Sequence, residues 1–227
     1  MQDTENTFDL DKARELVSNR LLWPRVRDFL WDFAPQVHPS WLEGLGSLDD
    51  LEQRSNLVLL ESPRVKSYIL NSLGVEPCFH PFLKDDGSRL LLLDGKTLVE
   101  ITKWLGALAC AEKMRMVTDG ATVRALKAAL PGVYPEVFGY TAYFRGNDFK
   151  CIGTETQGVQ RPEDVVSAGL EMLFSATAGL PESLVSRLKF KLPKVLHASA
   201  FRREIKYTVI LKLLKLKFPE AYSLCCC

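Results

Sequence analysis

The segment after Asp94 carries a long amphipathic helix pattern, and this pattern limits the possible folds more than any other feature. Leu98, Ile101 and Leu105 recur at spacings of three and four residues, which places them on one face of a helix. The aspartate directly before the pattern is a favourable N-cap. We therefore expect a central, heavily buried helix from Gly95 to about Val117. Further residues widen its apolar face: Trp104, Ala107, Leu108 and Ala111.

Helix boundary signals recur along the rest of the chain. Proline beside acidic residues is typical of a first helical turn, and glycine or proline is typical of a helix end. These signals, together with apolar residues at helical spacing, predict further helices. They are a helix from Asp9 that breaks or restarts at Pro24, a start near Ser47, Pro63 to Leu73, Ala121 to Leu130, Val133 to Phe144, Pro162 to Phe174, a helix between Pro181 and Pro193, and a final basic helix from His197 to Phe218.

The segment from Cys78 to Leu93 is the best candidate for β structure. Two short apolar runs, Phe79 to Leu83 and Leu90 to Leu93, flank the turn sequence Lys84 to Ser88. Together with the helix patterns, this predicts a mainly α fold with one or two small β-hairpins.

The chain shows no internal repeat and no long linker, so we expect a single multi-helix globular domain. Its predicted bounds are residues 9–220, with a flexible N-terminus at 1–8 and a flexible C-terminal tail at 221–227.

Large aromatic rings are concentrated between residues 23 and 41. A helical domain uses such rings to fill its core, and we favour this interpretation over an exposed aromatic binding patch. The rings belong to Trp23, Phe29, Trp31, Phe33 and Trp41.

The N-terminus and the cysteines indicate a cytosolic protein. The first residues lack the basic start and apolar core of a secretory signal, and no apolar run approaches the ~20 residues that cross a bilayer. Cys78, Cys110 and Cys151 show no paired spacing, which favours reduced thiols in the core. The run from Cys225 to Cys227 is similar to a prenylated tail, but the phosphate loop of proteins with such tails is missing, so we expect an unmodified terminus.

The net charge of +1 hides an uneven distribution. Residues 1–60 contain 11 acidic and 6 basic residues, whereas residues 187–217 contain 10 basic residues and the single acid Glu204. Such asymmetry favours an acidic partner, an anionic membrane surface or nucleic acid, or else it is compensated inside the fold. The candidate partner-binding residues are Arg187, Lys189, Lys191, Lys194, Arg202, Arg203 and Lys206.

Common enzyme signatures are absent from the sequence. It has no phosphate-binding loop, dinucleotide glycine motif, zinc-protease motif or serine elbow. Cys78 and His80 would share one face of a strand, where a thiolate and an imidazole can activate a nucleophile or bind zinc. Because no further ligands stand at metal spacing, we expect no catalytic, cofactor or metal site. A small enzyme built on this pair is the alternative.

Several stretches carry a family resemblance over most of the chain, from about residue 20 to 224. They are Leu91 to Leu98 (Leu-Leu-Leu-Asp-Gly-Lys-Thr-Leu), Trp104 to Leu108, Val123 to Leu130, Arg187 to Pro193 and Phe218 to Glu220. In these stretches the chain resembles the sorting-platform adaptor family of type III secretion systems (SctK, also called YscK, PscK, OrgA or MxiK). The triple-cysteine end is not a feature of that family.

The resemblance implies a non-enzymatic cytoplasmic adaptor at the cytosolic face of the bacterial inner membrane. Proteins of the family link the cytoplasmic domain of the inner-membrane ring protein (SctD) to the pod protein (SctQ) of the injectisome, and these are the partners it implies here. No cofactor and no nucleic acid are implied. A peripheral binder of anionic membranes or nucleic acid, using the basic C-terminal region, is the other alternative to the adaptor.

Overall fold

The structure, a computed structural model, describes residues 19–20, 22–43, 62–76, 87–144, 148–151, 161–194 and 203–226. Helices account for most of these residues, which confirms the prediction of a mainly α fold. The α-helices are α2 (Leu22–Trp31), α5 (Pro63–Ser72), α6 (Gly95–Arg115), α7 (Gly120–Ala129), α8 (Val133–Tyr140), α9 (Pro162–Ser175), α10 (Glu182–Lys191), α11 (Tyr207–Lys217) and α12 (Pro219–Cys226). Four short 3-10 helices join them: η1 (Ala34–Gln36), η2 (Pro39–Trp41), η4 (Ser88–Leu92) and η5 (Thr141–Tyr143).

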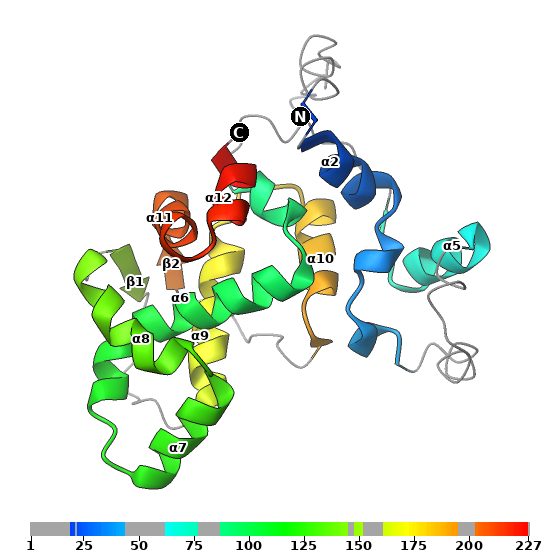
Figure 1. The fold of residues 1–227 in the computed structure, drawn as a ribbon. Helices are drawn as coiled ribbons and strands as arrows, with labels where there is room; N and C mark the ends of the chain where they lie inside the picture. The colour runs from blue at the N-terminus through cyan, green and yellow to red at the C-terminus, as the bar shows by residue number, and fades with distance from the viewer. Residues whose placement is uncertain are drawn as a thin grey trace, which may run out of the picture.

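Helix α6 is the centre of the molecule and crosses in front of α9 in Figure 1. Asp94 caps it as predicted: its carboxylate accepts hydrogen bonds from the Thr97 backbone N–H (2.9 Å) and hydroxyl (2.7 Å). Its 21 residues extend over about 30 Å. The helix ends at Arg115, close to the predicted end, and its predicted apolar face is buried.

Two glycines bring α6 and α9 into backbone contact. A Cβ atom added at Gly106 would lie 1.9 Å from the carbonyl oxygen of Val165, and one added at Gly169 would lie 1.8 Å from that of Thr102. Each glycine also faces the other's backbone nitrogen. The contact is therefore reciprocal, and the two helices approach more closely than any side chain at these positions would allow.

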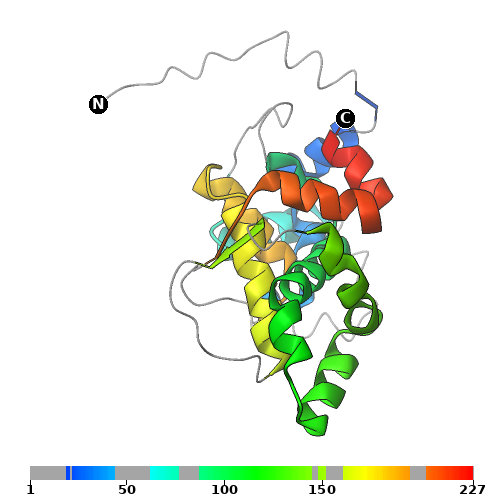
Figure 2. The same cartoon turned by 90° about the vertical axis from the view of Figure 1, so that its left-hand side faces the viewer.

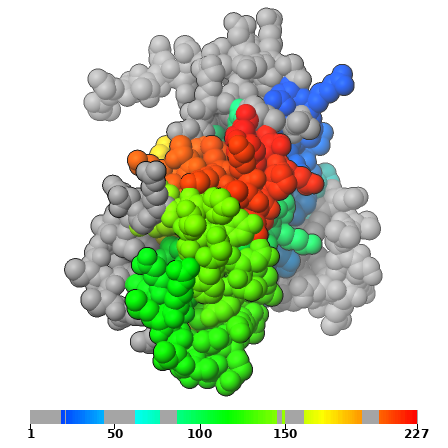
Figure 3. Space-filling model, turned by 60° about the vertical axis from the view of Figure 1, so that its left-hand side comes forward, coloured from blue at the N-terminus to red at the C-terminus, as the bar shows by residue number. Residues whose placement is uncertain are grey.

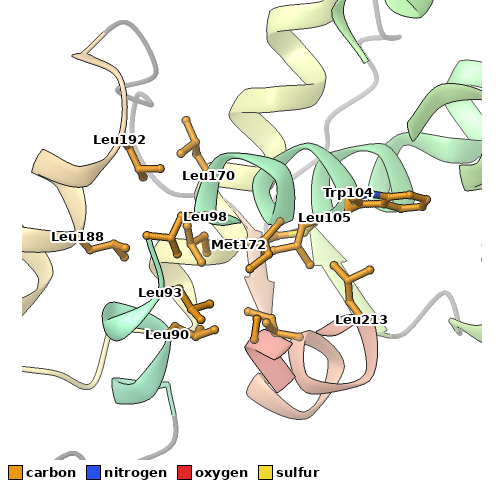
Figure 4. Packing of buried hydrophobic residues seen from close by; sticks show 14 of the residues in the cluster. Leu90, Leu93, Leu98, Trp104, Leu105, Leu170, Met172, Leu188, Leu192 and Leu213 are labelled. Atoms are coloured by element: carbon orange, nitrogen blue, oxygen red, sulfur yellow. The ribbon is translucent and has the colours of Figure 1, made fainter. Parts of the chain in front are cut away.

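The other elements extend the core around this crossing. Figure 4 shows leucines from η4, α9, α10 and α11 converging on α6. Figure 2 shows α11 (orange) and α12 (red) at the end of the molecule opposite to α7 (green). Buried core residues labelled in Figure 4 are Leu90, Leu93, Leu98, Trp104, Leu105, Leu170, Met172, Leu188, Leu192 and Leu213.

The described β structure is a single two-stranded ladder formed by distant segments. β1 (Phe149–Cys151) pairs antiparallel with β2 (Arg203–Ile205), and Phe149 lies opposite Ile205. The sequence instead predicts a local hairpin, whose first arm, residues 79–83, lies outside the described residues.

The second arm of that predicted hairpin is wrong, because residues 88–92 form the 3-10 helix η4. Gly87 precedes η4 with φ of 86°, a left-handed conformation that suits glycine. A Cβ atom there would lie 2.3 Å from the carbonyl oxygen of Ala176, so the chain turns tightly against the end of α9. The leucines that look like a strand are thereby buried in a helical turn.

The C-terminal region also differs from the prediction. The final basic helix begins at Tyr207 rather than His197, because Arg203–Ile205 is paired as a strand. Residues 219–226, mostly assigned to a flexible tail, form α12, and Cys225 is buried. The helix predicted from Asp9 and the predicted N-terminal segment lie outside the described residues.

We expect Gly106→Ala and Gly169→Ala each to lower the free energy of unfolding by about 3 kcal/mol, because the added methyl group meets a backbone carbonyl that cannot rotate away. Urea unfolding followed by circular dichroism measures the loss. Gly139→Ala is the matched control: Gly139 lies in α8 with no atom within 4 Å of its Cβ position. The control should gain about 0.5–1 kcal/mol, since alanine favours the helix. Equal stability of all three variants would contradict the close crossing.

Candidate partner-binding site

Helix α10 carries three of the predicted partner-binding cations, and it buries two of them. Arg187 is 2 % exposed and Lys191 is 1 % exposed. Arg187 donates hydrogen bonds to the backbone carbonyls of Phe29, Leu30 and Glu76. The first two are among the last carbonyls of α2, which have no acceptor role inside that helix. Arg187 therefore caps the C-terminus of α2 and ties it to the segment after α5.

Lys191 likewise donates to backbone carbonyls, here those at the end of η4 and in the segment that leads into α6. Its Nζ donates to the carbonyl oxygens of Leu91 (2.6 Å) and Leu93 (2.9 Å) and lies 4.8 Å from the centre of the Phe29 ring. Burial lowers the pKa of Lys191 to about 7, and the negative charge of Asp94 opposes this shift only in part. Arg187 and Lys191 are thus internal residues, which corrects their assignment to a partner surface.

Lys189 and Lys194 are exposed and lie beside Trp41. Their Nζ atoms are 5.5 Å and 5.7 Å from the centre of the indole ring. The indole nitrogen donates to the carbonyl oxygen of Leu192 at 2.9 Å, which fixes the ring against the end of α10. Cation–π contacts of this kind hold two positive charges at one aromatic surface.

The three remaining predicted residues belong to the C-terminal region. Lys206 is exposed just before α11, Arg203 lies in β2, and Arg202 is outside the described residues. Of the seven candidates, the structure brings together Lys189 and Lys194 on the surface and Arg187 and Lys191 in the interior. Internal compensation by backbone carbonyls, rather than a continuous basic face, accounts for the two buried members.

Helices α2 and α5 each carry an exposed aromatic side chain. Trp31 is 58 % exposed and Tyr68 is 45 % exposed, and the Trp31 ring packs edge-on to Trp23 at 5.8 Å between centres. Phe29 and Phe33 are buried as predicted, so the core assignment of the aromatic segment is wrong for Trp31. Trp31 lies about 180° around the helix from Leu22, which was the signal available in the sequence. We call the pair Trp31 and Tyr68 the α2–α5 surface.

A second exposed surface lies on η5 and α11, beside α8 in Figure 3. Tyr143 is 55 % exposed and Leu216 is 38 % exposed. Lys217 lies 4.2 Å from the ring centre of Tyr140 and 4.4 Å from that of Trp104, and it pairs with Glu136. We call the pair Tyr143 and Leu216 the η5–α11 surface, which the sequence patterns did not indicate.

An open pocket of about 770 Å³ lies between α2, the segment 35–39, the start of α6 and the end of α10. Its charged residues come from segments far apart in the sequence, so no local motif predicts it. The cations are Arg25, Arg27, Lys96 and Lys191, and the acids are Asp28, Asp32 and Asp94.

Three acids of the pocket already have partners. Asp28 accepts from Arg27 at 2.8 Å, and Asp32 pairs with Lys66 at 2.6 Å. Partial burial raises the pKa of Asp94, but the hydrogen bonds from Thr97 outweigh it and leave the pKa below its usual value. Asp94 is therefore ionised and committed to the N-terminus of α6.

The candidate enzyme pair, Cys78 and His80, lies outside the described residues. Among the residues that are described, no group of three or more histidine, cysteine, aspartate or glutamate side chains is placed to hold a metal ion. Cys110 is buried in α6, as predicted for a core cysteine, and Cys151 lies in β1. Within the same ranges, no helix combines the length and the apolar character that a membrane span needs.

Comparisons with protein-family models, curated proteins and solved structures found no match. The functional evidence therefore comes from the residues of this chain and their arrangement.

The pKa of Lys191 makes the stability of the protein dependent on pH. Its value of about 7 in the folded state lies below the 10.5 of an unperturbed lysine, so between these values the unfolded state binds more protons. Stability should then rise with pH by up to about 1.4 kcal/mol per unit and level off above the unfolded pKa. Below pH 7 the Lys191 amine is protonated in both the folded and the unfolded state, so this contribution no longer changes with pH.

We expect Lys191→Met to abolish that rise, since methionine has a similar shape and does not titrate. Urea unfolding of both proteins at pH 7 and at about pH 9 gives the difference in stability, which should grow with pH in favour of the natural protein. Comparing the difference removes the contribution of every other titrating group. A difference that stays constant would show that Lys191 remains charged in the folded state.

Proposed function

We propose that this chain is a non-enzymatic scaffold adaptor of a type III secretion sorting platform, located at the cytosolic face of the inner membrane. Its partners would be the cytoplasmic domain of the ring protein (SctD-like) and the pod protein (SctQ-like). The observation that carries the proposal is the presence of two separate pairs of exposed large hydrophobic side chains on one helical body, Trp31 and Tyr68 of the α2–α5 surface and Tyr143 and Leu216 of the η5–α11 surface. A connector needs two such surfaces.

The two surfaces lie beside different parts of α6. The α2–α5 surface lies towards the N-terminal end of α6, because α2 packs against η4, which leads into that helix. The η5–α11 surface lies beside the middle of α6, where Trp104 packs edge-on to Tyr140 at 5.5 Å, and beside its C-terminal end, where Arg115 donates to the Thr141 hydroxyl of η5 at 3.2 Å. Since α6 extends over about 30 Å, two proteins bound at these surfaces would not compete for the same area.

The chemistry of both surfaces suits protein partners. Tryptophan and tyrosine are enriched where proteins bind one another. Lys66 lies by Asp32 next to the first surface, and Lys212 lies 5.3 Å from the Phe144 ring at the second. Charges at such positions influence association rate and orientation more than affinity.

Two of the stretches that resemble the adaptor family lie in the central scaffold. Residues 91–98 contain the end of η4 and the capped start of α6, and residues 104–108 include Gly106 at the α9 crossing. The resemblance of these stretches to the adaptor family therefore involves residues that set how the helices pack. This supports a shared scaffold role, whereas partner choice would depend on the two surfaces.

Separate variants of the two surfaces test the adaptor. We expect Trp31→Ser with Tyr68→Ser to weaken binding to one partner by about tenfold or more, and Tyr143→Ser with Leu216→Ser to weaken binding to the other. Purified ring-protein cytoplasmic domain and pod protein, measured separately by biolayer interferometry, give the dissociation constants. Because all four side chains are exposed, stability should change by less than about 0.5 kcal/mol per site.

Met116→Ser is the matched control, since Met116 is 78 % exposed at the end of α6 and belongs to neither surface. It should bind both partners normally. Failure of the unmodified protein to bind either partner would overturn the proposal. Loss of both partners from the same double variant would show that the two surfaces do not divide the partners between them.

A further inference from the structure

We infer that the open pocket between α2, the start of α6 and the end of α10 binds a carboxylate group. This inference goes beyond the adaptor function and does not depend on it. It follows from three features of the pocket: a buried positive charge without a paired anion, donors with no acceptor, and a net charge that matches a single negative charge.

The buried charge is that of Lys191. Among the described residues its Nζ has two carbonyl acceptors and the Phe29 ring, but no carboxylate within ion-pair distance. The charged groups that act on it are Asp94, which favours its charged form, and Arg25 and Arg187, which oppose it. A buried charge is costly unless an opposite charge accompanies it. An anion in the adjoining pocket would supply that charge.

The donors belong to the start of α6 and to α2. Gly95 and Lys96 line the pocket as the first two residues of the helix, so their backbone N–H groups have no acceptor within it. Asp94 accepts from Thr97 instead. Among the described residues, the Lys96 ammonium and the Arg25 guanidinium have no hydrogen bond or ion pair. The helix N-terminus and these side chains together suit an oxyanion.

The charge balance selects a carboxylate over a phosphate. Four lysine and arginine side chains and three acids line the pocket, which gives these seven groups a net charge of +1 below pH 7, where Lys191 is protonated. Asp28 and Asp32 would repel a phosphate dianion more strongly than a monoanion. The volume of about 770 Å³ is in the usual range for organic ligands and short peptide segments.

A carboxylate has two sources, a glutamate or aspartate side chain of a peptide and a free organic acid. Two probes distinguish them: a blocked pentapeptide with one glutamate between glycines, and propionate. The peptide with glutamine in place of glutamate and inorganic phosphate are the comparison probes. NMR titration of the isotope-labelled full chain follows the amide resonances of Gly95 and Lys96 directly.

We expect these two amide resonances to shift and saturate with at least one carboxylate probe, and the tighter probe identifies the source. Arg25→Gln with Lys96→Gln should weaken binding about tenfold, or ~1.4 kcal/mol. Arg124→Gln with Lys127→Gln, which removes the same charges from exposed positions on α7, should leave binding unchanged.

Three results would overturn the inference. The first is the absence of saturable shifts with both carboxylate probes at millimolar concentration. The second is an equal loss of affinity in the two double variants, which would indicate attraction by overall charge. The third is tighter binding of phosphate or of the glutamine peptide than of the carboxylate probes.

Discussion

The close crossing of α6 and α9 is the constraint on which the remaining packing depends. Gly106 and Gly169 place the two helices in backbone contact. At each glycine, backbone atoms of the other helix occupy the space that a side chain would need. Leucines of η4, α10 and α11 then fill the space around the crossing (Figure 4). If the helices moved apart by the width of a methyl group, these side chains would lose contacts on one side, which closely packed interiors do not tolerate without loss of stability.

Buried cations are the second unusual element, and their partners are carbonyls rather than carboxylates. Helix C-termini present carbonyls without intrahelical donors, and they carry partial negative charge. Arg187 and Lys191 use that property at α2 and at the segment before α6. The same α10 exposes Lys189 on its outer side. Helix α10 thus forms buried hydrogen bonds from its cations to backbone carbonyls and also a surface cation–π contact with Trp41.

The sequence predicts α6 and its cap because local spacing and one aspartate suffice to specify them. It does not predict which cations are buried, since the carbonyl acceptors of Arg187 lie more than 100 residues away along the chain. The leucines of η4 look like a strand because an apolar run has no periodicity of its own, and contact with α9 at Gly87 decides its shape. For the candidate site, the sequence points to Lys189 and Lys194, which are exposed beside Trp41, and their role in binding a partner stays a prediction. The pocket joins segments that only the fold brings together.

The contact between Arg187 and α2 also orders events during synthesis of the chain. The donor and the carbonyl of Phe29 are separated by 158 residues, so α2 leaves the ribosome long before its C-terminal cap exists. Domains generally fold from the N-terminus onwards during synthesis. Here the first described helix, α2, receives its capping side chain from α10, which is synthesised late. Until α10 has been synthesised, the carbonyls of Phe29 and Leu30 therefore lack this donor, and water is the partner that remains for them.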